Sequence, residues 1–240
     1  MKLTLVRKQK EVKGVTSFFW KAEPSIEWQP GQYLYYTIEL PQKDPRGNVR
    51  HFTISASPTE NEIRLTTKLS DSLYKKVLFE LPEGSEINGS GPRGDFVLDQ
   101  EKNDPQIFLA GGIGITPFRA FIKYAVDKGF KTPIHLIYSS STPEEIAFKN
   151  DLDKWMQQNP NLKVAYTITK PEEGGIGWDG LTGRINAEMI KQALGTRGWA
   201  LDEVNFWLCG PPAFTEAMEA ELAKLKIDPG KIETEQFTGY

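Results

Sequence analysis

A change of hydrophobic pattern near residue 105 constrains the fold more than any other feature of this 240-residue chain. Beyond Pro105, short apolar runs alternate with amphipathic stretches of helical period, which is typical of βαβ units around a parallel sheet. The expected strands are 107–110, 134–138, 164–168 and 204–208, and the expected helices are 117–126, 143–158, 185–193 and 212–225. The second half of the chain is therefore predicted to be an α/β domain.

The first hundred residues have a different texture, with short β-like runs separated by turn residues such as Pro30-Gly31. Strands are expected at 33–38, 51–55, 63–67 and 96–98, and this spacing favours an antiparallel barrel or sandwich. One helix is expected to begin after Ser72, because apolar residues recur there at helical spacing. We predict two domains, 1–102 and 103–240, each with its own sheet.

Composition removes several classes of function. The single cysteine, Cys209, cannot form an intrachain disulfide or supply the four thiolates of an iron–sulfur cluster, and with two histidines it gives no usual zinc set. A net charge of −3 argues against a nucleic-acid partner. With no apolar run long enough for a membrane span or a signal peptide, we expect a soluble, cytoplasmic protein without a bound metal. Any redox chemistry would then need an organic cofactor.

A glycine-rich turn follows the first expected parallel strand, in the sequence Gly111-Gly112-Ile113-Gly114-Ile115-Thr116-Pro117. Glycines allow a tight turn and close approach of a ligand to the backbone. Thr116 is a suitable N-cap, Pro117 suits the first helical position, and the free amides of such a helix start bind a pyrophosphate. The alternative is a tight strand–helix turn without a ligand.

Three further segments accompany this turn in a fixed order. They are Arg50-His51-Phe52-Thr53, Gly91-Pro92-Arg93-Gly94-Asp95-Phe96 and Cys209-Gly210-Pro211-Pro212. With the glycine turn they resemble the ferredoxin–NADP reductase superfamily, over essentially the whole chain. The resemblance implies an antiparallel β-barrel flavin domain followed by an α/β parallel-sheet pyridine-nucleotide domain. It also implies hydride transfer from NAD(P)H to a bound flavin.

On the flavin side, the resemblance assigns Arg50 to a flavin phosphate, which a guanidinium binds with charge-assisted hydrogen bonds. Phe52 would stack on the isoalloxazine ring, where the family more often has tyrosine. The hydroxyl of Thr53 would lie near flavin N5. Ser72 would contact the phosphate at a helix start, and Lys68 is a weaker candidate for the same region. Each has an ordinary structural alternative: a surface ion pair, a strand residue or a helix cap.

On the nucleotide side, the resemblance places Gly112, Gly114, Thr116 and Pro117 around the pyrophosphate. Cys209, followed by Gly210 and Pro211, would lie beside the nicotinamide; its alternative is a buried small side chain.

The chain end Glu233-Thr234-Glu235-Gln236-Phe237-Thr238-Gly239-Tyr240 resembles the family's acidic–aromatic ending. Glu235 would be the acid near the reacting atoms, and Phe237 or Tyr240 would cover the flavin. The alternative is a frayed terminus.

The sequence leaves several choices open. FAD is favoured over FMN. NADPH is favoured over NADH, with Lys170 as the candidate partner of a 2′-phosphate, because no acidic residue stands at the ends of the second and third parallel strands. The electron acceptor is expected to be separate: a ferredoxin or flavodoxin, a partner oxygenase, or a free flavin or quinone. A non-catalytic flavin or nucleotide sensor and an electron-relay subunit are the rivals, and the oligomeric state stays open.

Overall fold

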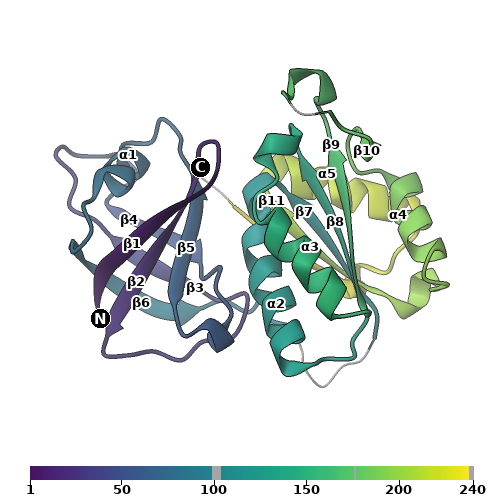
Figure 1. Ribbon diagram of the computed structural model, residues 1–240, viewed down its shortest axis with the longest axis horizontal. Helices are drawn as coiled ribbons and strands as arrows, with labels where there is room; N and C mark the ends of the chain where they lie inside the picture. The colour runs from purple at the N-terminus through teal and green to yellow at the C-terminus, as the bar shows by residue number, and fades with distance from the viewer. Residues whose placement is uncertain (99–103, 176, 238–240) are drawn as a thin grey trace.

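The computed structural model describes residues 1–98, 104–175 and 177–237 of the chain. It contains two six-stranded sheets that share no strand and lie side by side (Figure 1). The first is built from the N-terminal residues and the second from the C-terminal ones, so the predicted two-domain class is confirmed. The predicted boundary between residues 102 and 103 lies outside the described residues.

The first sheet is antiparallel throughout, with strand order β4-β3-β6-β1-β2-β5. Its strands are β1 (Lys2–Val12), β2 (Val15–Glu23), β3 (Tyr33–Thr37), β4 (Val49–Thr53), β5 (Ile63–Lys68) and β6 (Glu86–Arg93). A bridge between Ile54, just after β4, and Leu65 of β5 joins the two outer strands and closes the sheet into a barrel. Helix α1 (Leu73–Glu80) follows β5 and covers one end, where Tyr74 donates a hydrogen bond to the Tyr36 carbonyl at 2.8 Å.

The second sheet is parallel, with order β10-β9-β8-β7-β11-β12. Its strands are β7 (Gln106–Gly111), β8 (Ile134–Ser140), β9 (Leu162–Ile168), β10 (Leu181–Thr182), β11 (Asn205–Gly210) and β12 (Ile232–Gln236). From β7 the chain runs outward to β10 and then returns to the other side of β7 for β11. The order therefore reverses between β7 and β11, and open α/β sheets bind ligands outside the carboxyl ends of strands at such a point.

Four helices cover the two faces of this sheet, α2 (Ile115–Lys128), α3 (Lys149–Gln158), α4 (Ala187–Gly195) and α5 (Pro212–Lys224). Helices α2 and α3 pack on one face and α4 and α5 on the other, each over its own apolar cluster (Figure 1). Strands with both faces covered have continuous apolar runs, which is why the sequence predicted the strands β7, β8, β9 and β11.

Three local predictions differ from the structure. Residues 96–98 form no strand; Phe96 packs its ring against Phe118, Phe121 and Trp207 of the second domain, with centroids 5.0–6.0 Å apart. The helix expected from Pro143 begins at Lys149, because Pro143–Glu145 is a separate 3-10 turn. Strands β1, β2, β6, β10 and β12 were not predicted, since β1 and β12 are rich in charged residues and β10 has two residues.

Candidate functional site

The glycine turn holds the end of β7 against the end of β11. A side chain at Gly114 would place its Cβ 2.1 Å from the carbonyl oxygen of Cys209, so only glycine fits there. The ring of Phe214 occupies the space in front of Gly111 and Gly210 in the same way, 2.6–2.7 Å from where a Cβ would stand. Gly112 has a positive φ of 53° and open space before it. These glycines let the two strand ends and α5 approach closely.

Helix α2 begins two residues earlier than expected. Gly114 occupies the N-cap position, and Thr116 lies inside the first turn, where its hydroxyl donates to the Ile113 carbonyl at 3.1 Å. The predicted capping role of Thr116 is therefore wrong, because its side chain bonds backward to the turn. Pro117 is the third helical residue instead of the first. A proline is tolerated there because the first four amides of a helix have no intrahelical partner.

A cavity of about 600 Å³ opens at the carboxyl ends of the parallel strands. Such a volume is within the range of small-molecule and cofactor sites. The turn contributes Gly111–Ile113, the strand ends contribute 138–141 and Thr169, α5 contributes Phe214, and the barrel contributes Val15 and Lys68. The structure thus brings two of the predicted nucleotide residues, Gly112 and Pro211, to the cavity wall.

Two predicted cations take unexpected places. Lys68 lies on the cavity wall and forms an ion pair of 2.7 Å with Glu145, which spans the two domains. Lys170 is exposed, pairs with Glu173 at 2.9 Å and is not among the cavity-lining residues. The arginine on the wall is Arg184, just after β10. The sequence offered no signal for it, because a two-residue strand has no hydrophobic period.

The ends of β11 and β12 bring the predicted thiol and acid together. Cys209 is fully buried and pairs in register with Glu235, so the chain end up to Gln236 is a strand, not a frayed terminus. Burial raises the pKa of Cys209 well above its usual value, and the charge of Glu235 adds to the shift. Burial also raises the pKa of Glu235 to about 7. The amide of Phe237 donates to the Gly210 carbonyl at 3.0 Å, whereas Tyr240 lies outside the described residues.

The charge of Glu235 acts on Tyr33 of the barrel, which pairs in register with Thr53. The two residues lie on β3 and β4, and Thr53 is 4% exposed. A hydrogen bond with Tyr35 and burial raise the pKa of Tyr33, and the charge of Glu235 raises it further. The Oγ1 of Thr53 and the Oε2 of Glu235 are both buried, and neither has a hydrogen-bond partner within the described ranges. Buried polar atoms without partners are rare and point to a ligand that would supply the bonds.

The two faces of β4 carry different aromatic surfaces. Phe52 is 4% exposed, with its ring inside the barrel against Tyr36 and Tyr74, at centroid distances of 5.9 and 6.2 Å. Its position does not support the predicted stacking on a flavin, because almost no ring surface is free. The face shared with Thr53 instead carries His51, with Tyr33 and Tyr35 at 5.0 and 5.8 Å. The sequence analysis did not single out these three rings.

Arg50 anchors the loop before β4. Its Nη1 donates to the carbonyls of Arg46, Gly47 and Val49 at 2.8–3.0 Å, and its Nη2 pairs with Asp44 at 3.3 Å. The guanidinium also lies 5.1 Å from the ring centroid of Tyr74 in α1. Arg50 is therefore held beside the helix that begins after Ser72.

Positive charge gathers around the first turn of α1. Lys75 is 4% exposed and donates to the Lys68 carbonyl; burial, followed by the charge of Arg46, lowers its pKa to about 8. Ser72 occupies the N-cap position without a side-chain capping bond, and the buried Oγ of Ser70 has no partner in the described part of the chain. Like charges converge only at a cost, so this arrangement suits an anion.

Metal-binding clusters and membrane-spanning helices are both absent from the described residues. The described residues hold no group of three or more His, Cys, Asp or Glu side chains suited to a metal ion. No helix among them is long and apolar enough to cross a membrane.

The fold and the cavity define a class: a barrel joined to a nucleotide-type α/β domain, with the ligand-sized cavity at the switch point of the parallel sheet. Residues 108–220 match the family model described as the oxidoreductase NAD-binding domain. The chain is 35% identical over 217 residues to NADH-cytochrome b5 reductase 1 of Mortierella alpina, covering 80% of this chain and 70% of that protein. The chain belongs to the ferredoxin–NADP reductase superfamily.

Two further similarities cover almost the whole chain. The flavohemoprotein of Bacillus subtilis (strain 168) is 28% identical over 239 residues, 97% of this chain, but this chain spans only 58% of it. The crystal structure of the flavohem-like FAD/NAD-binding domain of nitric oxide dioxygenase from Vibrio cholerae superimposes with a TM-score of 0.84. It shares 23% identity, with 98% of each chain covered, and supports the fold.

Proposed function

We propose that this chain binds FAD and NADPH, transfers hydride from the nucleotide to the flavin, and passes the electrons to a separate acceptor. One observation carries the proposal: a nucleotide-sized cavity opens at the carboxyl ends of the parallel strands, and its wall includes Pro211, two residues beyond the Cys209 that pairs with Glu235. FAD and NAD(P)H fit the residues present. The unpartnered Oγ1 of Thr53 and the cationic first turn of α1 offer the hydrogen bonds and charge that a flavin and its phosphates need.

The flavin would lie along the barrel between these two places. Arg50, the amides after Ser72 and the hydroxyl of Ser70 would bind its phosphates, because charged acceptors suit a guanidinium and a helix start. Thr53 would donate to the ring system. Tyr33 and His51 would offer the aromatic surface that the buried Phe52 does not. We assign residues 1–102 to this flavin domain and 103–240 to the nucleotide domain.

The nucleotide would occupy the cavity. Gly112, Gly114, Thr116 and Pro117 would present the turn and the first amides of α2 to its pyrophosphate, and Gly210 and Pro211 would form the opposite wall. Arg184 takes the place that the sequence analysis gave to Lys170, because it lines the cavity and Lys170 does not. Its guanidinium, with the hydroxyls of 139–141 and Thr169, suits a 2′-phosphate.

When bound, the flavin would supply the chemistry of accepting a hydride and releasing electrons. The chain's residues bind and orient. Buried Cys209 would give the nicotinamide an apolar, neutral neighbour, since burial keeps its thiol protonated. Glu235, with a pKa of about 7, would hold or release a proton beside it near neutral pH. Phe237, at the end of β12, would cover the flavin face.

The acceptor follows from chemistry and from the relatives' names. Cytochrome b5 is a one-electron haem acceptor, and the flavohemoprotein carries further chain beyond the region matched here. We favour a one-electron protein acceptor, such as a haem or iron–sulfur protein or a partner oxygenase, over a free flavin or quinone.

We expect the purified protein to bind FAD, to be bleached anaerobically by NADPH, and to be re-oxidised repeatedly by ferricyanide. Hydride transfer needs the nicotinamide and the flavin in contact. In the proposed arrangement the cavity holds the nucleotide and Thr53 holds the flavin ring next to it. The measurement is the flavin absorbance under argon, followed by extraction of the cofactor. A protein that binds FAD but is not reduced by either nucleotide would be a sensor, not an enzyme.

Arg184→Ala is expected to raise the KM for NADPH about tenfold, since one charged hydrogen bond near solvent is worth roughly 1.5 kcal/mol. The KM for NADH should change little, because NADH has no 2′-phosphate. Lys170→Ala is the matched control and should leave both values unchanged. A larger effect of Lys170→Ala than of Arg184→Ala would return the 2′-phosphate to Lys170.

A further inference from the structure

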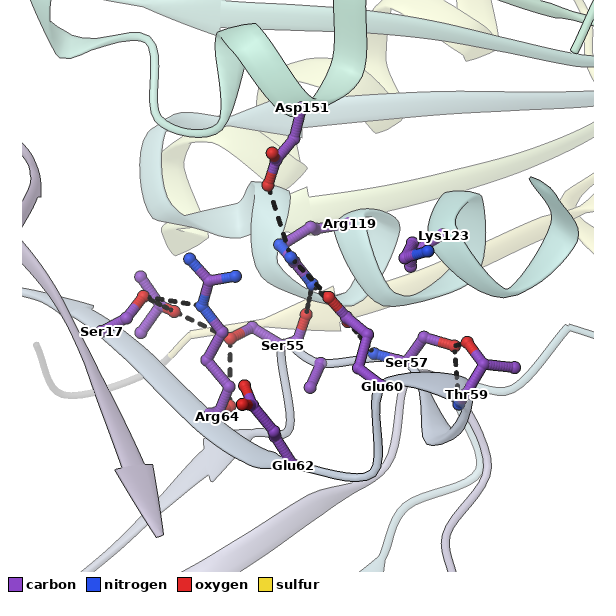
Figure 2. Close-up of polar contacts among 12 residues, drawn as sticks. Ser17, Ser55, Ser57, Thr59, Glu60, Glu62, Arg64, Arg119, Lys123 and Asp151 are labelled. Carbon is purple, nitrogen blue, oxygen red and sulfur yellow. Dashed lines mark hydrogen bonds and ion pairs between the residues drawn. The ribbon is translucent and has the colours of Figure 1, made fainter. Parts of the chain in front are cut away.

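A guanidinium of the nucleotide domain is buried against the flavin domain (Figure 2). Arg119 lies on α2 and is 2% exposed. Its Nη1 donates to the Ser55 carbonyl at 2.9 Å and to Glu60 Oε2 at 2.8 Å, and its Nη2 donates to Glu60 Oε1 at 2.9 Å. Asp151 of α3 lies 3.4 Å from the same Nη2. A two-pronged bond of this kind fixes direction as well as distance.

Both sides of this contact lie close in the chain to residues of the candidate reaction centre. Arg119 follows Thr116 by one helical turn, in the helix that begins at the glycine turn. Ser55 follows Thr53 by two residues, at the end of β4. One guanidinium thus joins the backbone that carries the nucleotide turn to the backbone that carries the flavin-side hydroxyl.

The acceptor Glu60 is itself held rigidly. It ends the 3-10 turn Pro58–Glu60, and its Oε2 accepts the Ser57 amide at 2.7 Å in a capping box. Burial raises the pKa of Glu60, but the hydrogen bonds and charge of Arg119 lower it more, so the pKa lies below its ordinary value. The carboxylate therefore stays ionised at neutral pH.

A second buried arginine supports the first. Arg64 on β5 donates to Ser17 Oγ at 2.9 Å (Figure 2). It also donates to Glu11 at 2.7 Å. The ring of Phe148 lies between the two guanidiniums, 4.9 Å from that of Arg64 and 5.2 Å from that of Arg119. Phe148 has a φ of 61°, a left-handed conformation that a phenylalanine adopts only where its surroundings hold it. The contact is thus part of a braced interface.

The domains have other contacts besides this one. Phe96 packs on Phe121 and Trp207 through apolar surface, the half-exposed Lys68 pairs with Glu145, and the Thr59 hydroxyl donates to Asp127 of α2. None of these is a two-pronged bond, so they fix direction less than the Arg119 fork does. Loss of Arg119 would therefore leave the domains attached and change their register.

We propose that Arg119 is a positioning residue. Paired with Glu60 and Ser55, it sets the alignment of the glycine turn against β4, which carries Thr53, and hence the distance for hydride transfer. The proposal rests on the function proposed above. A displacement of about 1 Å at a reaction centre costs on the order of 100-fold in rate. We call the contact of Arg119 with Glu60 and Ser55 the clamp. Its loss should slow hydride transfer much more than it lowers the affinity for either ligand.

The test compares Arg119→Gln, Arg119→Lys and Glu60→Gln with Lys123→Gln as control. Lys123 is one turn further along α2 and pairs with Asp127 of the same helix, whose Oδ2 accepts the Thr59 hydroxyl. Its loss removes a charge from the same interface but none of the hydrogen bonds of Arg119. In the FAD-loaded proteins, we expect the limiting rate of flavin reduction by NADPH to fall about 10- to 100-fold in the clamp variants. The half-saturating NADPH concentration and the flavin content should stay within about threefold. Arg119→Lys, which keeps the charge but loses the fork, should recover the rate only in part.

A second readout needs no turnover. Amide hydrogen exchange of residues 55–60 in flavin-free protein should quicken in Arg119→Gln and not in Lys123→Gln. Equal limiting rates in wild type and clamp variants, in a wild type that NADPH does reduce, would overturn the positioning role and leave the proposed function standing. A wild type that no nicotinamide nucleotide reduces would overturn both. A clamp variant that loses flavin and slows in step with that loss would show only a folding role.

Discussion

Arg50→Ala is expected to weaken FAD binding by about 10- to 150-fold, because a hydrogen bond to a charged group is worth roughly 1.5–3 kcal/mol. Arg50 is the cation held closest to the ring of Tyr74 in the first turn of α1, and its removal also frees the carbonyls of Arg46, Gly47 and Val49. The measurement is FAD titration of flavin-stripped protein by fluorescence quenching.

Two variants separate the phosphate role from the loop role. Lys76→Ala removes an exposed positive charge from the same helix, paired only loosely with Asp71, and should leave affinity unchanged. Arg50→Lys keeps the charge but lacks the planar fork that reaches the loop carbonyls and Asp44 together, so a substantial recovery of affinity points to the phosphate. Full FAD affinity in Arg50→Ala would mean that the phosphates bind elsewhere.

Glu235→Gln is expected to stabilise flavin-free protein by about 3 kcal/mol above pH 7, since each pKa unit corresponds to about 1.36 kcal/mol. Burial raises the pKa of Glu235 from 4.5 to about 7. The folded protein therefore holds a proton that the unfolded chain releases. The stability that this proton contributes is complete below pH 4.5 and is lost as the pH rises through 7.

The measurement is urea unfolding of wild type and Glu235→Gln between pH 4.5 and 8.5. The two curves should run together at the acid end and separate as the pH rises. Glu233→Gln, an exposed acid on the same strand, is the matched control and should follow the wild type. Parallel wild-type and Glu235→Gln curves across the range would show that Glu235 is hydrated and titrates normally. Because the charge of Glu235 raises the pKa of Cys209 and of Tyr33, their titration should shift in the variant as well.

The local parts of the fold followed from short stretches of sequence. Apolar runs buried on both sides, such as β7 and β11, have a pattern that depends only on neighbours along the chain, and so does the glycine turn. The starts of two helices were predicted at the wrong residues. Thr116 bonds backward to Ile113, and Pro143 begins a 3-10 turn, because local hydrogen bonds compete with the regular helix.

Some residues of the candidate site were also predicted from local motifs, and others were not. The Cys209 and Glu235 segments were found by motif, and the structure pairs them through β11 and β12. The predicted stacking of Phe52 on a flavin is not supported by its position, because its ring lies inside the barrel near Tyr74 and is 4% exposed. A one-residue change of face cannot be read from a strand of five residues whose partners lie elsewhere in the chain.

The sequence by itself determined the two-domain class, the family and the order of the flavin and nucleotide halves, because each depends on periodicity, glycines and motifs within a few residues. Only the tertiary structure decided that Arg184 lines the cavity, that Lys68 bridges to Glu145, and that Arg119 reaches across to Glu60. Arg119 and Glu60 are 59 residues apart, and their pairing depends on how two finished domains meet. No local pattern encodes such a contact, because the free energy that selects it arises only when both surfaces are formed and water leaves between them.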